Sequence, residues 1–156
     1  MKRRFRLAVV PVVAALAIVS LASGKPSQTA TTTKFKAALK TGQEVPHPKG
    51  TPVGASGSFR ATLTGVTLKW TLTYSHLSGT PIAAHIHLGA RGTNGIAVIQ
   101  LCGQPDPTAC HSPMSGTATE VADDLQALMM KGTTYVNVHT DKNAGGEIRG
   151  QISTAH

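Results

Sequence analysis

Two histidines, His85 and His87, stand one residue apart in the segment 84–89, which reads AHIHLG and has the apolar pattern of a β-strand. Because successive side chains on a strand alternate between its two faces, both imidazoles project to the same side. Two imidazoles spaced in this way can hold a metal ion with almost no rearrangement of the backbone. The pair therefore predicts part of a metal site, and a third ligand has to come from elsewhere in the chain.

A second strand-like segment, 135–140 (YVNVHT), offers that third ligand. The same alternation places Tyr135, Asn137 and His139 on one face of the strand. If this face meets the one that carries His85 and His87, three neutral imidazoles converge. Such a set suits copper or zinc and leaves a coordination position open for water or a further ligand.

Three more residues are candidates for supporting roles. His76, which follows a strand end, and His111, which is next to a cysteine, are the best candidates for a fourth ligand. Glu147 is a candidate acceptor for an imidazole N–H group. The competing interpretation is structural: the histidines donate hydrogen bonds to loop carbonyls and order one end of the domain.

The elements that must position these side chains are short strands. Past residue 33 the apolar residues recur with period two and are interrupted by turn residues, so we expect strands at 35–39, 58–64, 67–75, 82–88, 97–102, 116–121, 134–140 and 147–152. One short helix is expected to begin at an N-cap of Asp123 or Asp124 and to end at Gly132. Seven or eight strands with one helix predict an all-β Greek-key sandwich or barrel.

The N-terminus has the features of a secretory signal peptide spanning residues 1–24. Four basic residues lie within the first six positions, an apolar run covers 7–21, and small residues allow cleavage after Ala22 or Gly24. The apolar run is shorter than the roughly 20 residues of a membrane span, although an uncleaved anchor is the alternative. We expect a periplasmic or secreted protein without stable membrane insertion after cleavage.

The mature chain would contain a flexible leader, residues 25–33, and one domain, residues 34–153. Removal of four signal cations from the total of 15 leaves 11 basic against 7 acidic residues, a net charge of +4. These cations are scattered and are not interleaved with aromatic residues, which argues against nucleic-acid binding. In an oxidising compartment the two cysteines, Cys102 and Cys110, predict a local disulfide, with metal ligation by the thiolates as the rival interpretation.

Several motifs, in a fixed order, resemble the chordin-type (CHRD) domain family over residues 34–153. They are FxAxL at 35–39, GQEVP at 42–46, AHIHLG at 84–89, NG at 94–95, YVNVHT at 135–140 and GGEIRGQ at 145–151. The family is found in chordin, an extracellular antagonist of bone morphogenetic proteins, and as stand-alone exported domains in bacteria. The resemblance implies an immunoglobulin-like or superoxide-dismutase-like fold and an exported location, rather than a particular activity.

A weaker similarity concerns the arrangement of the histidines. His85, His87 and His139 are similar in order and strand setting to the copper ligands of exported Cu/Zn superoxide dismutases. The chain lacks an obvious bridging histidine and a loop with the ligands of a zinc half-site. The similarity therefore supports copper without zinc, and fold analogy does not establish function.

Three hypotheses about function follow. In the first, the domain binds a transition metal, preferably copper, for handling or buffering. In the second, it is a non-catalytic extracellular interaction module that binds another exported protein, and its histidines are structural. In the third, it is a copper-only enzyme with superoxide dismutase-like activity. Metal titration separates the first from the second, and a superoxide assay of the loaded protein tests the third.

Overall fold

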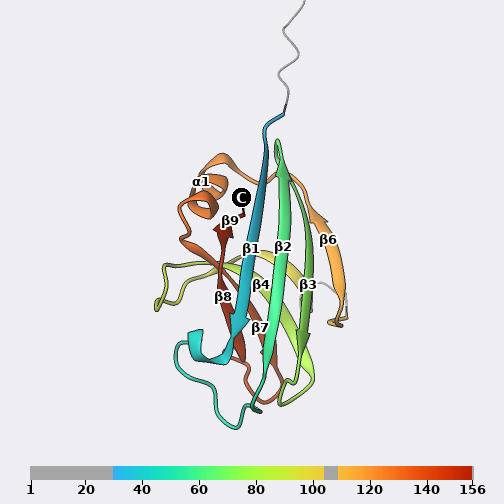
Figure 1. The fold of residues 1–156 in the computed structure, drawn as a ribbon, viewed down its shortest axis with the longest axis vertical. Helices are drawn as coiled ribbons and strands as arrows, with labels where there is room; N and C mark the ends of the chain where they lie inside the picture. The colour runs from blue at the N-terminus through green and yellow to red at the C-terminus, as the bar shows by residue number, and fades with distance from the viewer. Residues whose placement is uncertain (1–29, 104–108, 156) are drawn as a thin grey trace, which may run out of the picture.

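The computed structural model describes residues 30–103 and 109–155, so the expected signal segment 1–24 and residues 25–29 of the leader lie outside the described residues. Within the described ranges the chain forms one antiparallel sheet with the strand order β5-β4-β7-β8-β1-β2-β3-β6 (Figure 1). The strands are β1 (Thr32–Lys40), β2 (Ser56–Thr64), β3 (Thr67–Ser75), β4 (Pro81–Leu88), β5 (Ala97–Gly103), β6 (Met114–Ala118), β7 (Thr134–Thr140), β8 (Ile148–Gln151) and β9 (Ser153–Thr154). This confirms the expected all-β sandwich or barrel with one helix.

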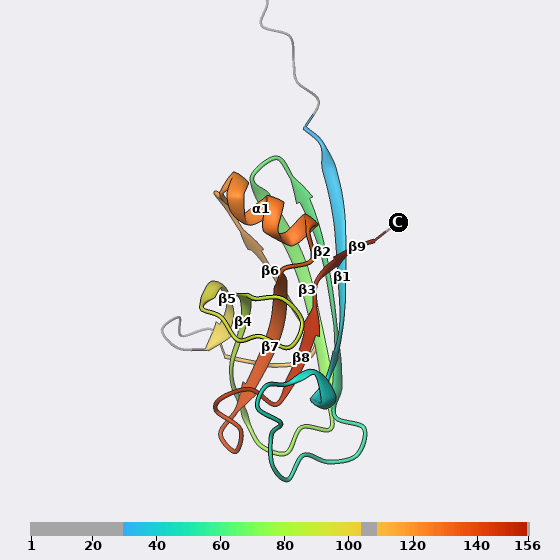
Figure 2. The same ribbon diagram turned by 90° about the vertical axis from the view of Figure 1, so that its left-hand side faces the viewer.

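The sheet curls into two halves. Strands β1, β2, β3 and β6 form one half, and β4, β5, β7 and β8 form the other. The halves join where β1 pairs with β8, at Lys40 and Arg149, and with the short β9 that follows β8. Figure 2 shows the two halves facing each other on either side of the interior. The apolar core lies between them and contains Phe35 and Phe59 from one half and Ile86, Val136 and Ile148 from the other.

Burial along the strands explains where a polar site can lie. In β3 the residues alternate as expected, with Leu68, Trp70 and Leu72 buried and the residues between them exposed. In β7, by contrast, all seven residues are buried. Antiparallel sheets commonly leave one face in water. Because β7 does not, its outer face must be covered by loops, and this is the face that carries His139.

Several expected boundaries were wrong. β1 begins at Thr32 rather than at 35, because Thr32 and Thr33 already pair with β2, so the expected leader overlaps the strand. The strand expected at 116–121 spans Met114–Ala118 instead. Glu120, with a φ of 57°, interrupts the extended backbone, and Val121 then reaches the core as a loop residue. The last expected strand is divided into β8 and β9.

A single α-helix, α1 (Asp123–Met130), is found among the described residues and lies at one end of the sandwich (Figure 2). A 3₁₀-helix of three residues, η1 (Thr41–Gln43), follows β1. Its N-cap is Ala122, which makes no side-chain cap, so the expected Asp123 or Asp124 cap was wrong. Both aspartates lie in the first turn, where their charge favours the positive end of the helix dipole. Met129 is fully buried and anchors the helix to the core. No helix in the described part of the chain is long and apolar enough to cross a membrane.

The predicted disulfide between Cys102 and Cys110 is present. β5 and β6 are the two ends of the strand order, and Cys110 precedes β6 by a few residues. The disulfide therefore ties the end of β5 to the segment that leads into β6, where no ladder joins the two strands.

Replacing both cysteines with serine is expected to lower the free energy of unfolding by about 2.5 kcal/mol, because the reduced unfolded chain regains the entropy of the closed loop. Urea unfolding of wild type and the double variant measures the difference. An unchanged unfolding midpoint would show that the disulfide does not contribute to stability.

Candidate metal centre

Strand pairing brings the three predicted histidines to one face. β4 lies between β5 and β7, and its ladder with β7 pairs Ala83 with His139 and His85 with Asn137. Residues that pair across an antiparallel ladder point to the same side. His85, His87 and His139 consequently share the outer face of this half, while the residues between them point into the core.

The three imidazoles form the group of possible metal ligands found among the described residues. One donor atom from each histidine lies within 4.8 Å of the others. His85 Nδ1 and His139 Nε2 are 3.3 Å apart, and the ring centroids of His85 and His87 are separated by 5.4 Å. Nitrogen ligands lie about 2.0–2.1 Å from zinc, which places two of them roughly 3–4 Å apart. Small side-chain rotations would therefore suffice to close the group around one ion.

Hydrogen bonds to loop carbonyls fix which ring nitrogen carries the proton. His87 Nδ1 lies 3.0 Å from the carbonyl oxygen of Gly95, and His139 Nδ1 lies 3.0 Å from that of Ala144. A carbonyl can only accept, so both Nδ1 atoms are the donors and both Nε2 atoms carry a lone pair. That of His139 Nε2 accepts from His85 Nδ1 at 3.3 Å. His87 Nε2 is buried and has no hydrogen-bond partner. Metal-binding histidines commonly have this arrangement, with the second N–H held by a carbonyl or carboxylate.

The electrostatic environment favours neutral rings. Burial lowers the pKa of His139 to about 4, against an opposing effect of the Ala144 carbonyl. The pKa of His85 is lowered by burial and by the neighbouring His87, and that of His87 is lowered chiefly by burial. A metal ion binds the deprotonated nitrogen, so these shifts keep the ligands available under mildly acidic conditions.

Arg149 fixes the loop that carries Gly95. Its guanidinium donates to the carbonyl oxygens of Ala90 at 3.0 Å and Thr93 at 2.7 Å, and to the side-chain oxygen of Asn94 at 3.2 Å. The side chain is only 1% exposed, so these bonds are shielded from water. Through this loop, a residue of β8 sets the position of the carbonyl that orients His87.

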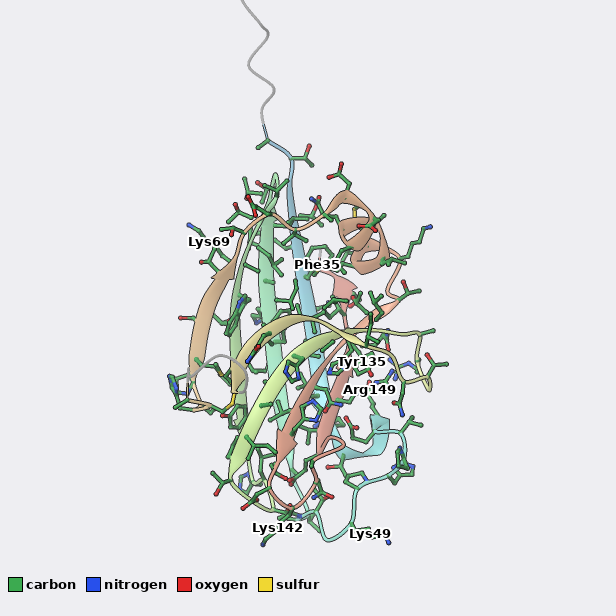
Figure 3. The ribbon with its side chains drawn as sticks, turned by 180° about the vertical axis from the view of Figure 1, so that it is seen from behind. Phe35, Lys49, Lys69, Tyr135, Lys142 and Arg149 are labelled. Atoms are coloured by element: carbon green, nitrogen blue, oxygen red, sulfur yellow. A yellow bond between two sulfur atoms is a disulfide. The ribbon has the colours of Figure 1, made fainter. Side chains whose placement is uncertain are left out.

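An aromatic contact links the same arginine to the histidines. The Tyr135 ring is stacked on His87 with centroids 5.0 Å apart and an interplanar angle of 10°. The Arg149 guanidinium carbon lies 3.4 Å from the Tyr135 ring centroid, a cation–π contact. Figure 3 shows Tyr135 and Arg149 next to each other beneath the loops. This contact restrains His87 from a second direction.

A buried carboxyl group, Glu44, lies on the same polar face. It is 3% exposed, its Oε2 accepts a bond of 3.4 Å from Asn137, and its Oε1 has no partner. Burial raises its pKa to about 7, although Arg149 opposes the shift. Gly146 packs so closely here that a Cβ would lie 2.5 Å from Glu44 Oε2. Sequence reasoning missed Glu44 as part of the site, and its only signal was its place in the 42–46 motif.

The other predicted residues do not join the cluster. His76 Nδ1 contacts the hydroxyl of Ser75, and His111 Nδ1 contacts the carbonyl of Ala109, both at the surface. Glu147, expected to accept from an imidazole, accepts instead from the Ser78 and Thr140 hydroxyls at 2.8 and 2.7 Å. Its strand begins one residue later, at Ile148, so the strand alternation used to place Glu147 does not apply to it.

The fold and the site define an antiparallel β domain with three clustered histidines on a loop-covered polar face. The model of the CHRD domain family matches residues 35–152. The chain belongs to the CHRD domain family, as the sequence motifs predicted. No curated protein and no solved structure matches it. The similarity of the histidines to the copper ligands of superoxide dismutases stays a prediction.

Proposed function

We propose that this CHRD domain binds one copper ion through His85, His87 and His139 and serves in metal handling or buffering. The observation that carries the proposal is the buried Nε2 of His87, which has no partner and belongs to a ring held by the Gly95 carbonyl. An unpaired buried polar atom costs free energy, and a bound ion would satisfy it.

The donor set favours copper. All three candidate ligands are imidazoles, and neither a thiolate nor a carboxylate belongs to the group within the described residues. For a given set of nitrogen ligands, affinity for divalent metals rises to a maximum at Cu²⁺ and is lower for Zn²⁺. A periplasmic or secreted location agrees with the disulfide, since disulfides persist in oxidising compartments.

The alternative is a protein-interaction module whose histidines only order the loops. The hydrogen bonds of His87 and His139 to loop carbonyls fit this hypothesis as well. It does not account for the unpaired Nε2 of His87, which a purely structural histidine would be expected to use.

The test is a Cu²⁺ titration by calorimetry of the wild type and of two double variants. The wild type is expected to bind about one ion per chain, and His85→Ala/His87→Ala is expected to lose at least about 100-fold in affinity, since two of three ligands are gone. His76→Ala/His111→Ala is the matched control, because both rings are exposed and lie outside the cluster. A wild type that binds no copper, or equal losses in both variants, would overturn the proposal.

A superoxide dismutation assay on the copper-loaded wild type then separates a carrier from an enzyme. Copper-dependent activity that disappears in His85→Ala/His87→Ala would support the dismutase hypothesis. Stoichiometric copper without activity would support handling or buffering.

A further inference from the structure

All charged side chains on the outer face of β1, β2, β3 and β6 are positive. These four strands contain no aspartate or glutamate, and five exposed cations point outward from three of them: Lys34, Lys36 and Lys40 from β1, Arg60 from β2 and Lys69 from β3. Cations often protect the edge strands of a sheet against pairing with other chains. That explanation does not apply here, because β1, β2 and β3 are all flanked by other strands.

Hydroxyl groups fill the space between these cations. Strands β2, β3 and β6 each carry serine or threonine at outward positions: Ser56, Ser58, Thr62, Thr71, Thr73, Ser75, Ser115 and Thr117. Apart from Ala38, the outward residues of these strands are polar or charged. The face is therefore a hydrogen-bonding surface with a net positive charge.

The same face is hollowed along its length. One groove of about 610 Å³ is lined by Lys34, Arg60 and Lys69 together with hydroxyl groups of β2, β3 and β6. A second groove of about 360 Å³ lies further along β1, β2 and β3 and includes Lys40. Lys34 and Lys40 are six residue steps apart, which is about 20 Å at the usual rise of a strand. An occupant that contacts both grooves must be extended rather than compact.

We propose that this face, which we call the cationic groove, binds a linear anionic polysaccharide. The cations would pair with its carboxylate or sulfate groups, and the serine and threonine hydroxyls would exchange hydrogen bonds with sugar hydroxyls. A lipid bilayer fits less well, since membrane-surface binding also needs apolar side chains to insert, and the face presents only Ala38. Single-stranded nucleic acid fits less well because no outward position of these strands is aromatic, so bases have no ring to stack on. Phe35, Trp70 and Tyr74, which also line the grooves, occupy inward positions of their strands.

The test measures binding of the wild type to immobilised polygalacturonate and dextran sulfate, with neutral dextran as the uncharged polymer. The variant Lys34→Gln/Arg60→Gln/Lys69→Gln is expected to bind the anionic polymers at least about tenfold more weakly than wild type and with a shallower dependence on salt. The matched control is Lys49→Gln/Lys131→Gln/Lys142→Gln, which removes the same charge from exposed positions elsewhere. Lys49 and Lys142 lie at the end of the molecule away from Lys69 (Figure 3). The control is expected to change affinity less than about threefold.

Three results would overturn the proposal: wild-type binding to anionic polymers no stronger than to dextran, equal losses in the two triple variants, or tighter binding to phosphatidylglycerol vesicles than to either polymer. The thermal unfolding midpoint and the Cu²⁺ titration check that the groove variant is folded. If it is not, the single variants Lys34→Gln and Lys69→Gln are each expected to weaken binding about two- to threefold. Single variants with unchanged affinity would then count against the groove.

Discussion

Replacing Arg149 with methionine is expected to destabilise the domain by about 3–5 kcal/mol, the range for removing one member of a buried, charged network. The guanidinium is almost fully buried and donates to two loop carbonyls and to Asn94. Methionine fills part of the volume but donates no hydrogen bond. The carbonyl oxygens of Ala90 and Thr93 would lose these donors, and the loop that carries Gly95 would lose its main attachment to β8.

The same substitution is expected to weaken copper binding about tenfold, because outer groups that orient a ligand commonly contribute this much. His87 would lose the fixed carbonyl that holds its Nδ1 proton and the restraint from Tyr135. Urea unfolding and Cu²⁺ titration measure the two effects. Arg60→Met is the control, since Arg60 is exposed on the opposite half and should change stability by less than about 0.5 kcal/mol. Equal effects of the two substitutions would contradict this role for Arg149.

The second large effect concerns Glu44 and pH. Its pKa is raised from 4.5 to about 7 in the folded domain, so the folded state holds a proton that the unfolded chain releases. This contribution is fully present below pH 4.5 and is lost as the pH rises through 7. The shift corresponds to about 3 kcal/mol. His85, His87 and His139 act in the opposite direction, because their lowered pKa values cost stability as the pH falls.

Glu44→Gln removes the contribution of the carboxyl group to this pH dependence and leaves that of the three histidines. The stability of the metal-free wild type minus that of the variant is expected to fall by about 3 kcal/mol between pH 4.5 and pH 8. Urea unfolding at closely spaced pH values measures this difference. Glu120→Gln, the same substitution at an exposed position, is the control. A constant offset for Glu44→Gln across the range would show that Glu44 does not titrate between these limits.

The sequence predicted well whatever depends on alternation along a single strand. The bounds of β3 and β7 are those expected, because alternating apolar residues in each are bounded by turn residues. The same alternation placed His85 and His87 on one face of β4, and it placed His139 on one face of β7. The ladder between the two strands brings these faces together. What the sequence could not provide was proof that the two strands are neighbours, since three elements (β5, β6 and α1) separate β4 from β7 along the chain and only the topology of the sheet places the two side by side.

Sequence reasoning missed the groups that orient the site, and the reason is physical. Gly95 and Ala144 act through backbone carbonyls, which have no side-chain signature. Arg149 falls within the strand expected at 147–152, yet its partners are loop carbonyls that only the folded chain brings to it. Alternation also misplaced Glu147, because it lies just before β8 and turns toward Ser78 and Thr140.

The pairing of β4 with its two neighbours has a consequence for folding. The ladder between β4 and β7 runs without interruption from Ala83 to Leu88. In the ladder between β4 and β5, the register shifts just before His85 and again just after Ile86. A slip of β4 by one residue would turn His85 and His87 into the core and expose Ile86. Only one of the two facings of this strand can assemble the three imidazoles. In a chain whose three imidazoles lie together, β4 is therefore paired in its native register. The geometry of the three ligands thus indicates whether this strand has folded correctly.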